Sequence, residues 1–133
     1  MIFDKAADEE ITARLLNWGI WNNRRGLPKF NYPSYVEIMR KYFPADGRFE
    51  PDDIDAQHLE DIISTLNVAG RGGFGWGDIY AFTLKLEFIE FGRPRESKAE
   101  HVRRKFDCPC SERTFRHHLY RAKRAVWAFA EKT

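Results

Sequence analysis

The sequence has little cysteine and no long apolar run, and both shortages narrow the class of protein. Only two cysteines occur among 133 residues, and a single residue separates them, so they cannot form a disulfide framework. No apolar segment approaches the length of a membrane span. The first ten residues become acidic at once and lack the basic and apolar regions of a signal peptide. We therefore expect a cytoplasmic protein with no membrane contact.

Motifs of catalysis are also missing, since the chain has neither a nucleophile elbow nor the paired histidines of a zinc protease. We expect no enzymatic activity and no cofactor. The acidic residues between 52 and 61 do not converge on one cavity with a histidine base, so we expect a solvated helix face. A Mg²⁺-dependent nuclease built on these carboxylates is the enzymatic alternative. The residues are Asp52, Asp53, Asp55, Glu60 and Asp61.

Cys108, Cys110, His117 and His118 are residue types that bind zinc. Closed tetrahedral sites usually place their cysteines further apart and separate their histidines. We therefore predict no metal site and interpret the cysteines as buried free thiols. A metal held by these four side chains stays open as the alternative.

Aromatic residues are plentiful, and charge is divided unevenly along the chain. Four Trp, five Tyr and eleven Phe can build a core and argue against disorder. Residues 92–133 hold twelve Lys or Arg and five Asp or Glu, a net charge of +7, whereas residues 1–91 hold ten and fifteen, a net charge of −5. Clustered cations attract polyphosphate backbones. We therefore divide the chain into an acidic helical region, 1–76, and a basic region, 77–133.

Apolar residues recur at helical spacing along most of the chain, and no segment shows convincing strand alternation. The predicted fold class is therefore all-α, a compact helical domain ending in a helix-turn-helix. The first three predicted helices run through Ile11, Leu15 and Trp18 to about 25–28, from Ser34 to Pro44 after an extended connection at 28–33, and from Asp52 or Asp53 to about Asn67. A fourth is predicted from Asp78 to Gly92, with Ile79, Phe82, Leu86 and Ile89 inward.

Residues 68–77 form a glycine-rich segment that contains a literal GxGxxG, from Gly70 to Gly75. That motif indicates a dinucleotide site only when a strand precedes it, and a helix is predicted here. We interpret the segment as a hinge loop between the acidic and basic regions, with a phosphate contact through Arg71 as the alternative. Trp76 is expected to anchor in the core.

The basic region ends in two predicted helices, the first spanning about 97–106. Cys108 precedes a proline, which biases it away from the helical region, and Ser111 can cap the helix that starts at Glu112. Arginines occupy one face of this last helix, and apolar residues form a stripe on the opposite face. The stripe consists of Phe115, Leu119, Ala122, Val126 and Phe129.

A helix of this kind fits the major groove, where Arg can donate two hydrogen bonds to a guanine edge while other cations contact phosphates. We therefore predict binding to double-stranded DNA, with bases read by the first turns of the last helix. A solvated, arginine-rich helix that only closes a bundle is the alternative. The predicted DNA-binding residues are Arg93, Arg95, Lys98, Arg103, Arg104, Lys105, Ser111, Arg113, Thr114, Arg116, His117, Tyr120, Arg121 and Arg124.

Several segments carry a family resemblance. Ile89-Glu-Phe91-Gly92, Ala99-Glu-His-Val102, Ser111-Glu-Arg-Thr114-Phe115 and Leu119-Tyr-Arg-Ala122-Lys123 resemble the promoter-reading helix-turn-helix of sigma factors. The same module occurs in the Q antitermination proteins of lambdoid phages. Leu15-Leu-Asn-Trp18-Gly19-Ile-Trp21 is similar to the Trp-Gly-x-Trp opening of one Q family, and Tyr32-Pro33-Ser34 and the acidic helix from Asp53 follow in the expected order. The resemblance spans about residues 12–130.

The resemblance implies a phage or prophage late-gene regulator in the cytoplasm of a bacterial host. Such a protein binds DNA overlapping a late promoter, joins a paused RNA polymerase holoenzyme that still holds sigma, and lets it read through terminators. By hypothesis, the acidic region 1–76 faces polymerase and the basic region reads DNA. The alternatives are a repressor or activator acting on a palindromic operator and a small terminase-like DNA recogniser. The oligomeric state stays open.

Overall fold

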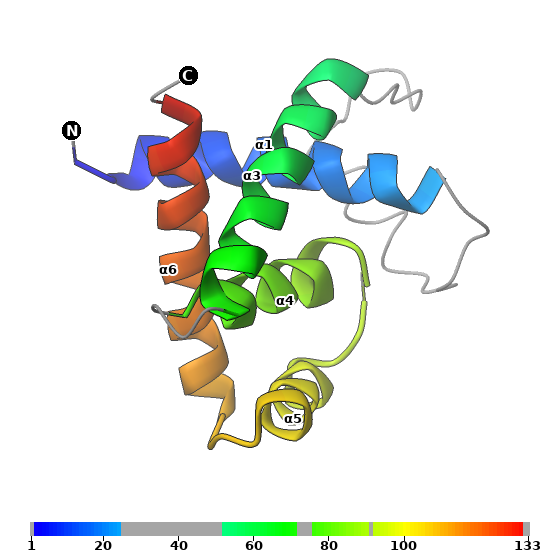
Figure 1. Cartoon of the computed structure of the whole chain (residues 1–133), viewed down its shortest axis with the longest axis vertical. Coiled ribbons are helices and arrows are strands. Elements are labelled where there is room, and N and C mark those ends of the chain that lie inside the picture. Colours follow the sequence, from blue (N-terminus) through cyan, green and yellow to red (C-terminus); the bar gives the residue numbers. More distant parts are fainter. Residues whose placement is uncertain (1, 25–51, 72–75, 91, 132–133) are drawn as a thin grey trace.

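The computed structural model describes residues 2–24, 52–71, 76–90 and 92–131, and every regular element in them is an α-helix (Figure 1). The helices are α1 (Lys5–Arg24), α3 (Asp53–Arg71), α4 (Gly77–Phe88), α5 (Arg95–Phe106) and α6 (Glu112–Glu131). The described residues contain no β-strand, and the prediction of a compact all-α domain is confirmed. The predicted connection at 28–33 and the short helix from Ser34 to Pro44 lie outside the described residues.

An aspartate caps each of the helices α1 and α3. The Asp4 carboxylate accepts a hydrogen bond from the Ala7 backbone N–H at 2.9 Å, and the Asp52 carboxylate accepts one from the Asp55 N–H at 3.1 Å. Both bonds satisfy amides that have no partner within the first turn of a helix. The predicted start of the helix at 52–53 is confirmed.

The first four residues of the glycine-rich segment 68–77 are helical, so its interpretation as a loop is wrong at the N-terminal end. α3 continues to Arg71, four residues beyond the predicted end at Asn67, and α4 already begins at Gly77. A single glycine costs only about 1 kcal/mol in a helix, and Leu66 anchors the preceding turn in the core. Residues 72–75 lie outside the described residues.

The larger apolar cluster joins α1, α3, α4 and the C-terminal half of α6, which lie across one another in Figure 1. Trp18 is fully buried at its centre, and its indole N–H donates to the Glu60 carboxylate at 2.6 Å. A buried indole needs such a partner. The other fully buried side chains of this cluster include Ile11, Leu15, Leu59, Leu84 and Val126.

Gly19 allows α1 to touch the end of α4. A Cβ atom at this position would lie 2.0 Å from the backbone oxygen of Phe88. Beside it, the Asn23 side-chain amide donates to the Ile89 carbonyl at 2.9 Å. The glycine of the Trp-Gly-x-Trp segment therefore has a packing role.

The smaller apolar cluster lies between α4, α5 and the first turns of α6. α6 contributes Phe115 to this cluster and Ala122, Val126, Trp127 and Ala130 to the larger one. The division proposed at 76/77 falls between α3 and α4, which both contribute to the larger cluster. The larger cluster contains α1 and α3 of the acidic region together with α4 and α6 of the basic region. The two regions therefore share one apolar core.

Four further predictions need correction. Phe129 is 46 % exposed, because the N-terminal segment covers the opposite side of the stripe and buries Trp127 instead. Trp76 is 52 % exposed at the start of α4 and does not anchor in the core. α4 ends at Phe88, and Gly92 lies in the following turn with φ of 80°. α5 begins at Arg95, directly after Pro94, two residues earlier than predicted.

None of the helices in the described part of the chain combines the length and the apolar character needed to cross a bilayer.

Candidate nucleic-acid interface

Five residues, 107–111, connect α5 to α6. Asp107 adopts the left-handed conformation with φ of 49°, which aspartate enters more readily than most residues. The Ser111 hydroxyl accepts a hydrogen bond from the Thr114 N–H at 3.1 Å, so the predicted cap is confirmed. Cys110 is buried in the smaller cluster, so its side chain packs the turn against α4, α5 and α6.

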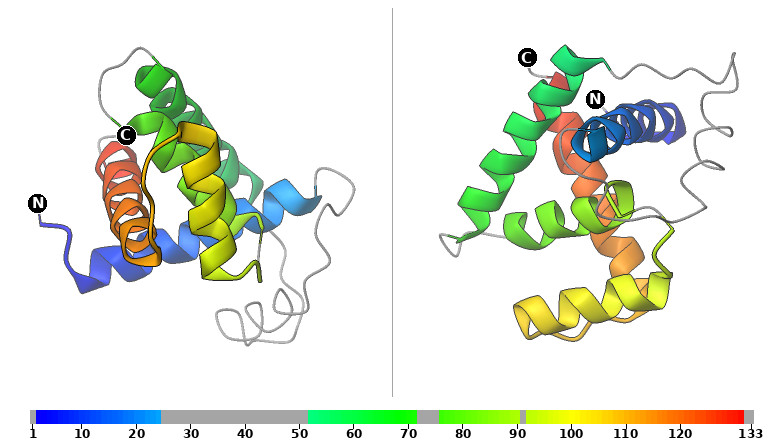
Figure 2. Two further views of the ribbon diagram at one scale, coloured as in Figure 1. Left: turned by 90° about the horizontal axis from the view of Figure 1, so that it is seen from below. Right: turned by 90° about the vertical axis from the view of Figure 1, so that its right-hand side faces the viewer.

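α5 lies across the beginning of α6 rather than alongside it (Figures 1 and 2). Val102 of α5 and Phe115 of α6 are both fully buried where the two helices meet. The Arg103 guanidinium reaches the Cys110 carbonyl at 3.5 Å across the turn. Because α5 packs on the side of α6 that carries Phe115, the opposite face of the first turns of α6 is open to solvent.

The open face of α6 carries most of the residues predicted to read DNA. Phe115, Ala122 and Val126 are fully buried on the other face, which confirms the amphipathic pattern. Within the described residues, none of the four arginines on the open face forms an ion pair, so their charge is available to a polyanion. The exposed residues of this face are Arg113, Arg116, His117, Arg121 and Arg124.

The N-terminal segment covers one edge of the second half of α6. The Phe3 ring contacts the rings of Tyr120 and Trp127, with centroids 5.5 and 5.3 Å apart. Lys123 pairs with the Asp8 carboxylate at 2.8 Å. Tyr120, predicted to read DNA, is therefore also a packing contact, although it remains 48 % exposed. Thr114 is half-buried beside the cap.

Four of the predicted phosphate contacts on α5 are exposed: Arg95, Arg103, Arg104 and Lys105. Arg104 pairs with Glu100 at 2.7 Å, one helical turn earlier, and both side chains are well exposed. Exposed pairs of this kind contribute only about 0.3–0.5 kcal/mol, so a phosphate can replace the carboxylate. Arg95 lies in the first turn of α5.

Arg93 and Lys98 are placed differently from the prediction, which assigned both to phosphates. The Lys98 ammonium is nearly buried and pairs with Glu87 at 2.5 Å, while Arg93 pairs with Glu90 at 2.6 Å and contacts His101. The chain reversal between α4 and α5 brings these opposite charges together. Their charges are paired with carboxylates, so these two residues fasten the segment from α4 to α5, and contact with DNA stays a prediction for both.

His117 and His118 occupy different environments on α6, since His117 is exposed and His118 is buried. The His118 ring lies near the rings of Trp76 and Tyr80, at 5.9 and 6.2 Å. Burial, reinforced by the charges of Arg121 and His117, lowers the pKa of His118, and its Nδ1 atom has no hydrogen-bond partner in the described part of the chain. Buried His118 therefore favours the neutral form.

The two cysteines differ in burial. Burial raises the pKa of the Cys110 thiol. Cys108 and Cys110 are both free thiols, and only Cys110 is fully buried. In the described ranges, no group of three or more His, Cys, Asp or Glu side chains could hold a metal ion.

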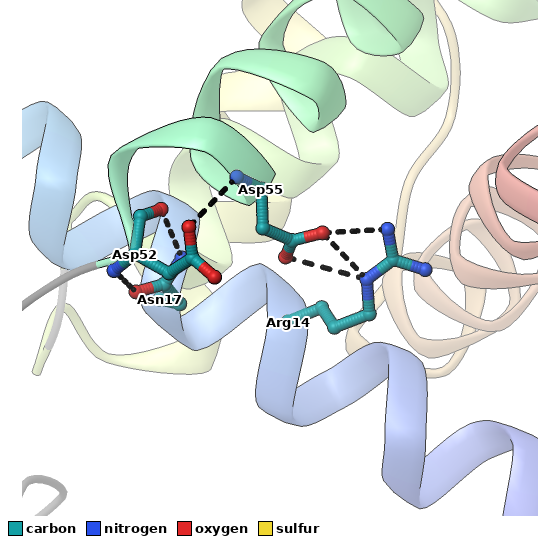
Figure 3. A network of polar contacts seen from close by, with 4 residues as sticks. All are labelled: Arg14, Asn17, Asp52 and Asp55. Carbon is teal, nitrogen blue, oxygen red and sulfur yellow. Dashed lines mark hydrogen bonds and ion pairs between the residues drawn. The ribbon is translucent and has the colours of Figure 1, made fainter.

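Two of the five acidic side chains expected on a solvated face, Asp55 and Glu60, instead fasten α3 to α1, and Figure 3 shows the contacts of Asp55 and of the Asp52 backbone. The Arg14 guanidinium donates to both oxygens of Asp55, with the shortest bond 2.7 Å, and this contact raises the pKa of Arg14. Asn17 exchanges two hydrogen bonds with the Asp52 backbone, at 2.8 and 3.0 Å. Glu60 accepts the Trp18 bond described above. Asp53 and Asp61 remain exposed.

The sequence analysis missed Lys85, which is exposed on α4. Lys85 lines one pocket together with Lys105 of α5, although the two lie twenty positions apart in the chain. It was overlooked because the surrounding helix is apolar, and only the packing of α5 on α4 reveals the pairing. Lys85 follows Asp78 by seven positions and Phe82 by three, a spacing that places all three residues on one face of a helix.

Comparisons of the chain with protein-family models, with curated proteins and with solved structures found no match. The arrangement of charged side chains on α5 and α6 is therefore the basis for a functional conclusion.

Proposed function

We propose that this protein is a DNA-binding transcription factor in which α5, the turn and α6 act as a helix-turn-helix. The observation that carries the proposal is the open face of α6, where four exposed arginines lack ion-pair partners among the described residues. Unpaired arginines on a solvent-facing helix provide the bidentate donors that recognise guanine edges.

The two helices have different roles in this proposal. Arg113, Arg116 and His117 lie in the first two turns of α6, the part of a recognition helix that reaches base edges. The exposed cations of α5 contact phosphates and set the position of α6 in the groove. Phe3 packs on Tyr120, and Asp8 of α1 pairs with Lys123, so the N-terminal part of the chain holds the second half of α6 in place. This anchoring fixes the orientation of the first turns of α6.

The wider role that we propose is that of a Q-type antitermination factor. Its sigma-factor-like helix-turn-helix would bind a DNA element near a late promoter, and the acidic region would join the sigma-containing RNA polymerase holoenzyme. This part rests on the resemblance of the Trp-Gly-x-Trp helix and the C-terminal motifs. Trp18 and Trp21 are buried, so the motif shapes α1 rather than contacting a partner directly.

The DNA-binding proposal is tested by selecting duplexes from a randomised library with the full chain. We expect one sequence family to be enriched and to bind more tightly than a scrambled duplex of the same length, measured by fluorescence anisotropy at two salt concentrations. Affinity should fall steeply with salt because phosphate contacts release counterions. No enrichment, or binding that is equal on scrambled DNA and insensitive to salt, would overturn the proposal.

A further inference from the structure

A small pocket lies where three helices meet away from α6. It is formed by Asn67 near the C-terminal end of α3, by one side of α4 from Asp78 to Lys85, and by the C-terminal end of α5. These three parts lie on the same side of the molecule in the right-hand view of Figure 2. The pocket has a volume of about 140 Å³, and its lining includes Asn67, Asp78, Phe82, Lys85, Lys105 and Phe106.

The floor of the pocket is aromatic and its rim is cationic. Phe82 and Phe106 are half-buried and meet edge to face, with centroids 5.7 Å apart. Lys85 and Lys105 are exposed, and neither forms an ion pair with a described residue. The Lys105 ammonium lies 4.7 Å from the Phe82 ring centroid, which keeps this cation above the aromatic floor.

Two further polar groups complete the lining. The Asn67 side chain brings an amide that can both donate and accept. The Asp78 carboxylate accepts a hydrogen bond from the Ile79 N–H at 2.9 Å at the start of α4. It lines the pocket and can accept further hydrogen bonds from N–H groups of a bound molecule. The set combines cations, an amide and an acceptor around an apolar floor.

We propose that this pocket binds an acidic peptide segment of a partner protein. An aromatic or leucine side chain of the segment would cover Phe82 and Phe106, while flanking carboxylates pair with Lys85 and Lys105. Asn67 and Asp78 suit the carbonyl and N–H groups of a peptide main chain. The proposal adds a protein-binding site to the DNA reader and does not depend on DNA binding.

The same features argue against a DNA backbone as the occupant. No α6 residue lines the pocket in the described structure, whereas α6 carries the proposed reading face. A phosphodiester would gain nothing from the two aromatic rings. Peptide recognition by a small pocket that combines aromatic and charged side chains uses both kinds of group.

The test is a selection of peptides from a phage-displayed library of random twelve-residue sequences on the full-length chain, without DNA. We expect the enriched sequences to place an aromatic residue or leucine among two or more Asp or Glu. A synthetic copy should bind the chain in an anisotropy assay, and Lys85→Glu or Lys105→Glu should weaken it roughly tenfold through charge repulsion. Lys5→Glu, an exposed lysine on α1, is the matched control and should leave affinity unchanged.

Lys85 is exposed, so Lys85→Glu should leave the protein folded, with a thermal unfolding midpoint lowered only slightly by the carboxylate in the last turn of α4. The proposal is overturned if no enriched peptide depends on Lys85. It is also overturned if Lys85→Glu weakens duplex DNA binding as much as Lys105→Glu does, since the pocket would then serve phosphates. Failure of DNA binding alone would leave the peptide measurement intact and would count only against the reading role of α6.

Discussion

The function of a charged residue depends on what its side chain contacts, and the basic region contains two contrasting cases. Lys98 is nearly buried and paired with Glu87, so its charge stabilises the junction of α4 and α5. Arg113 and Arg116 are exposed at the beginning of α6, and no ion pair with a described residue holds them. Exposed charges are available to a nucleic acid, either directly or, as with Arg104, by exchanging a weak surface partner for a phosphate.

Substitutions should therefore separate base reading from phosphate contact. Arg113→Ala and Arg116→Ala should each cost about 1–3 kcal/mol on the selected site and relax its sequence preference. Arg104→Ala should weaken binding to every duplex and reduce the salt slope by roughly one. Lys98→Gln should leave the salt slope unchanged and lower stability. Anisotropy on matched and mutated sites measures DNA binding by all four variants, and urea unfolding measures the stability of Lys98→Gln. Identical binding by the three arginine variants would place the reading face elsewhere.

His118 should make stability depend on pH. Its pKa in the folded state lies below the ordinary value of 6.5, so near and below that pH the unfolded chain binds more protons than the folded one. The stability that depends on neutral His118 is present above pH 6.5 and is lost as the pH falls through that value toward the lowered pKa. Urea unfolding at pH 7.5 and 5.5 should show a smaller loss in His118→Gln than in the natural chain. Exposed His117→Gln is the control, and an equal loss in all three proteins contradicts the assignment.

At the scale of the residue, sequence alone predicted which positions of α6 face solvent. Helical spacing placed Phe115, Ala122 and Val126 on the buried face, and the structure confirms all three. Ion pairs between helices were not predictable, because the reversal that brings Glu87 to Lys98 depends on where α4 ends and α5 begins. For the same reason the sequence did not indicate the pocket position of Lys85 or the pairing of Lys98.

α6 links the two apolar clusters of the protein. Its N-terminal half meets α4 and α5, and its C-terminal half meets α1, α3 and α4. Periodicity predicted this helix and its cap at Ser111, because both are local properties of the sequence. Which neighbour covers each side is not local, so Phe129 was expected inside and Trp127 took its place.

The contact between α1 and α4 can be tested at Gly19. In an open helix interior, Gly→Ala stabilises by about 1 kcal/mol. Here the added methyl group would lie 2.0 Å from a backbone oxygen of Phe88, which cannot move aside as a flexible side chain can. We expect Gly19→Ala to destabilise the protein by about 2–3 kcal/mol, as in overpacked cores. Urea unfolding measures the change, and a stabilised variant would show that α1 and α4 do not approach this closely.

The whole molecule combines a basic face on α5 and α6 with an acidic balance over residues 1–91. The acidic residues are not equivalent, however. The Asp55 carboxylate holds Arg14 of α1, and the Asp52 carboxylate caps α3, so reversing their charge would disturb folding before it disturbed any partner. Asp53 and Asp61 are exposed and can be changed without breaking these contacts.

Charge reversal at these two positions tests the proposed polymerase contact. We expect the double variant Asp53→Lys and Asp61→Lys to lose association with sigma-containing RNA polymerase in a pull-down with purified components, because the proposed surface is attracted by charge. Glu96→Lys reverses an exposed acidic residue on α5 and is the control for a general effect of charge. Unchanged association of the double variant would exclude this surface.

Transcription through a terminator tests the central claim most directly, that this protein reads DNA with α6 and acts on RNA polymerase. The template carries the selected DNA site beside a promoter, with a terminator downstream, and transcription uses purified holoenzyme with and without the protein. We predict readthrough that requires both the DNA site and Arg113, with Arg113→Ala reducing it to the level seen without protein. Termination that is unaffected by the protein, or readthrough that persists when the site is scrambled, would contradict the account.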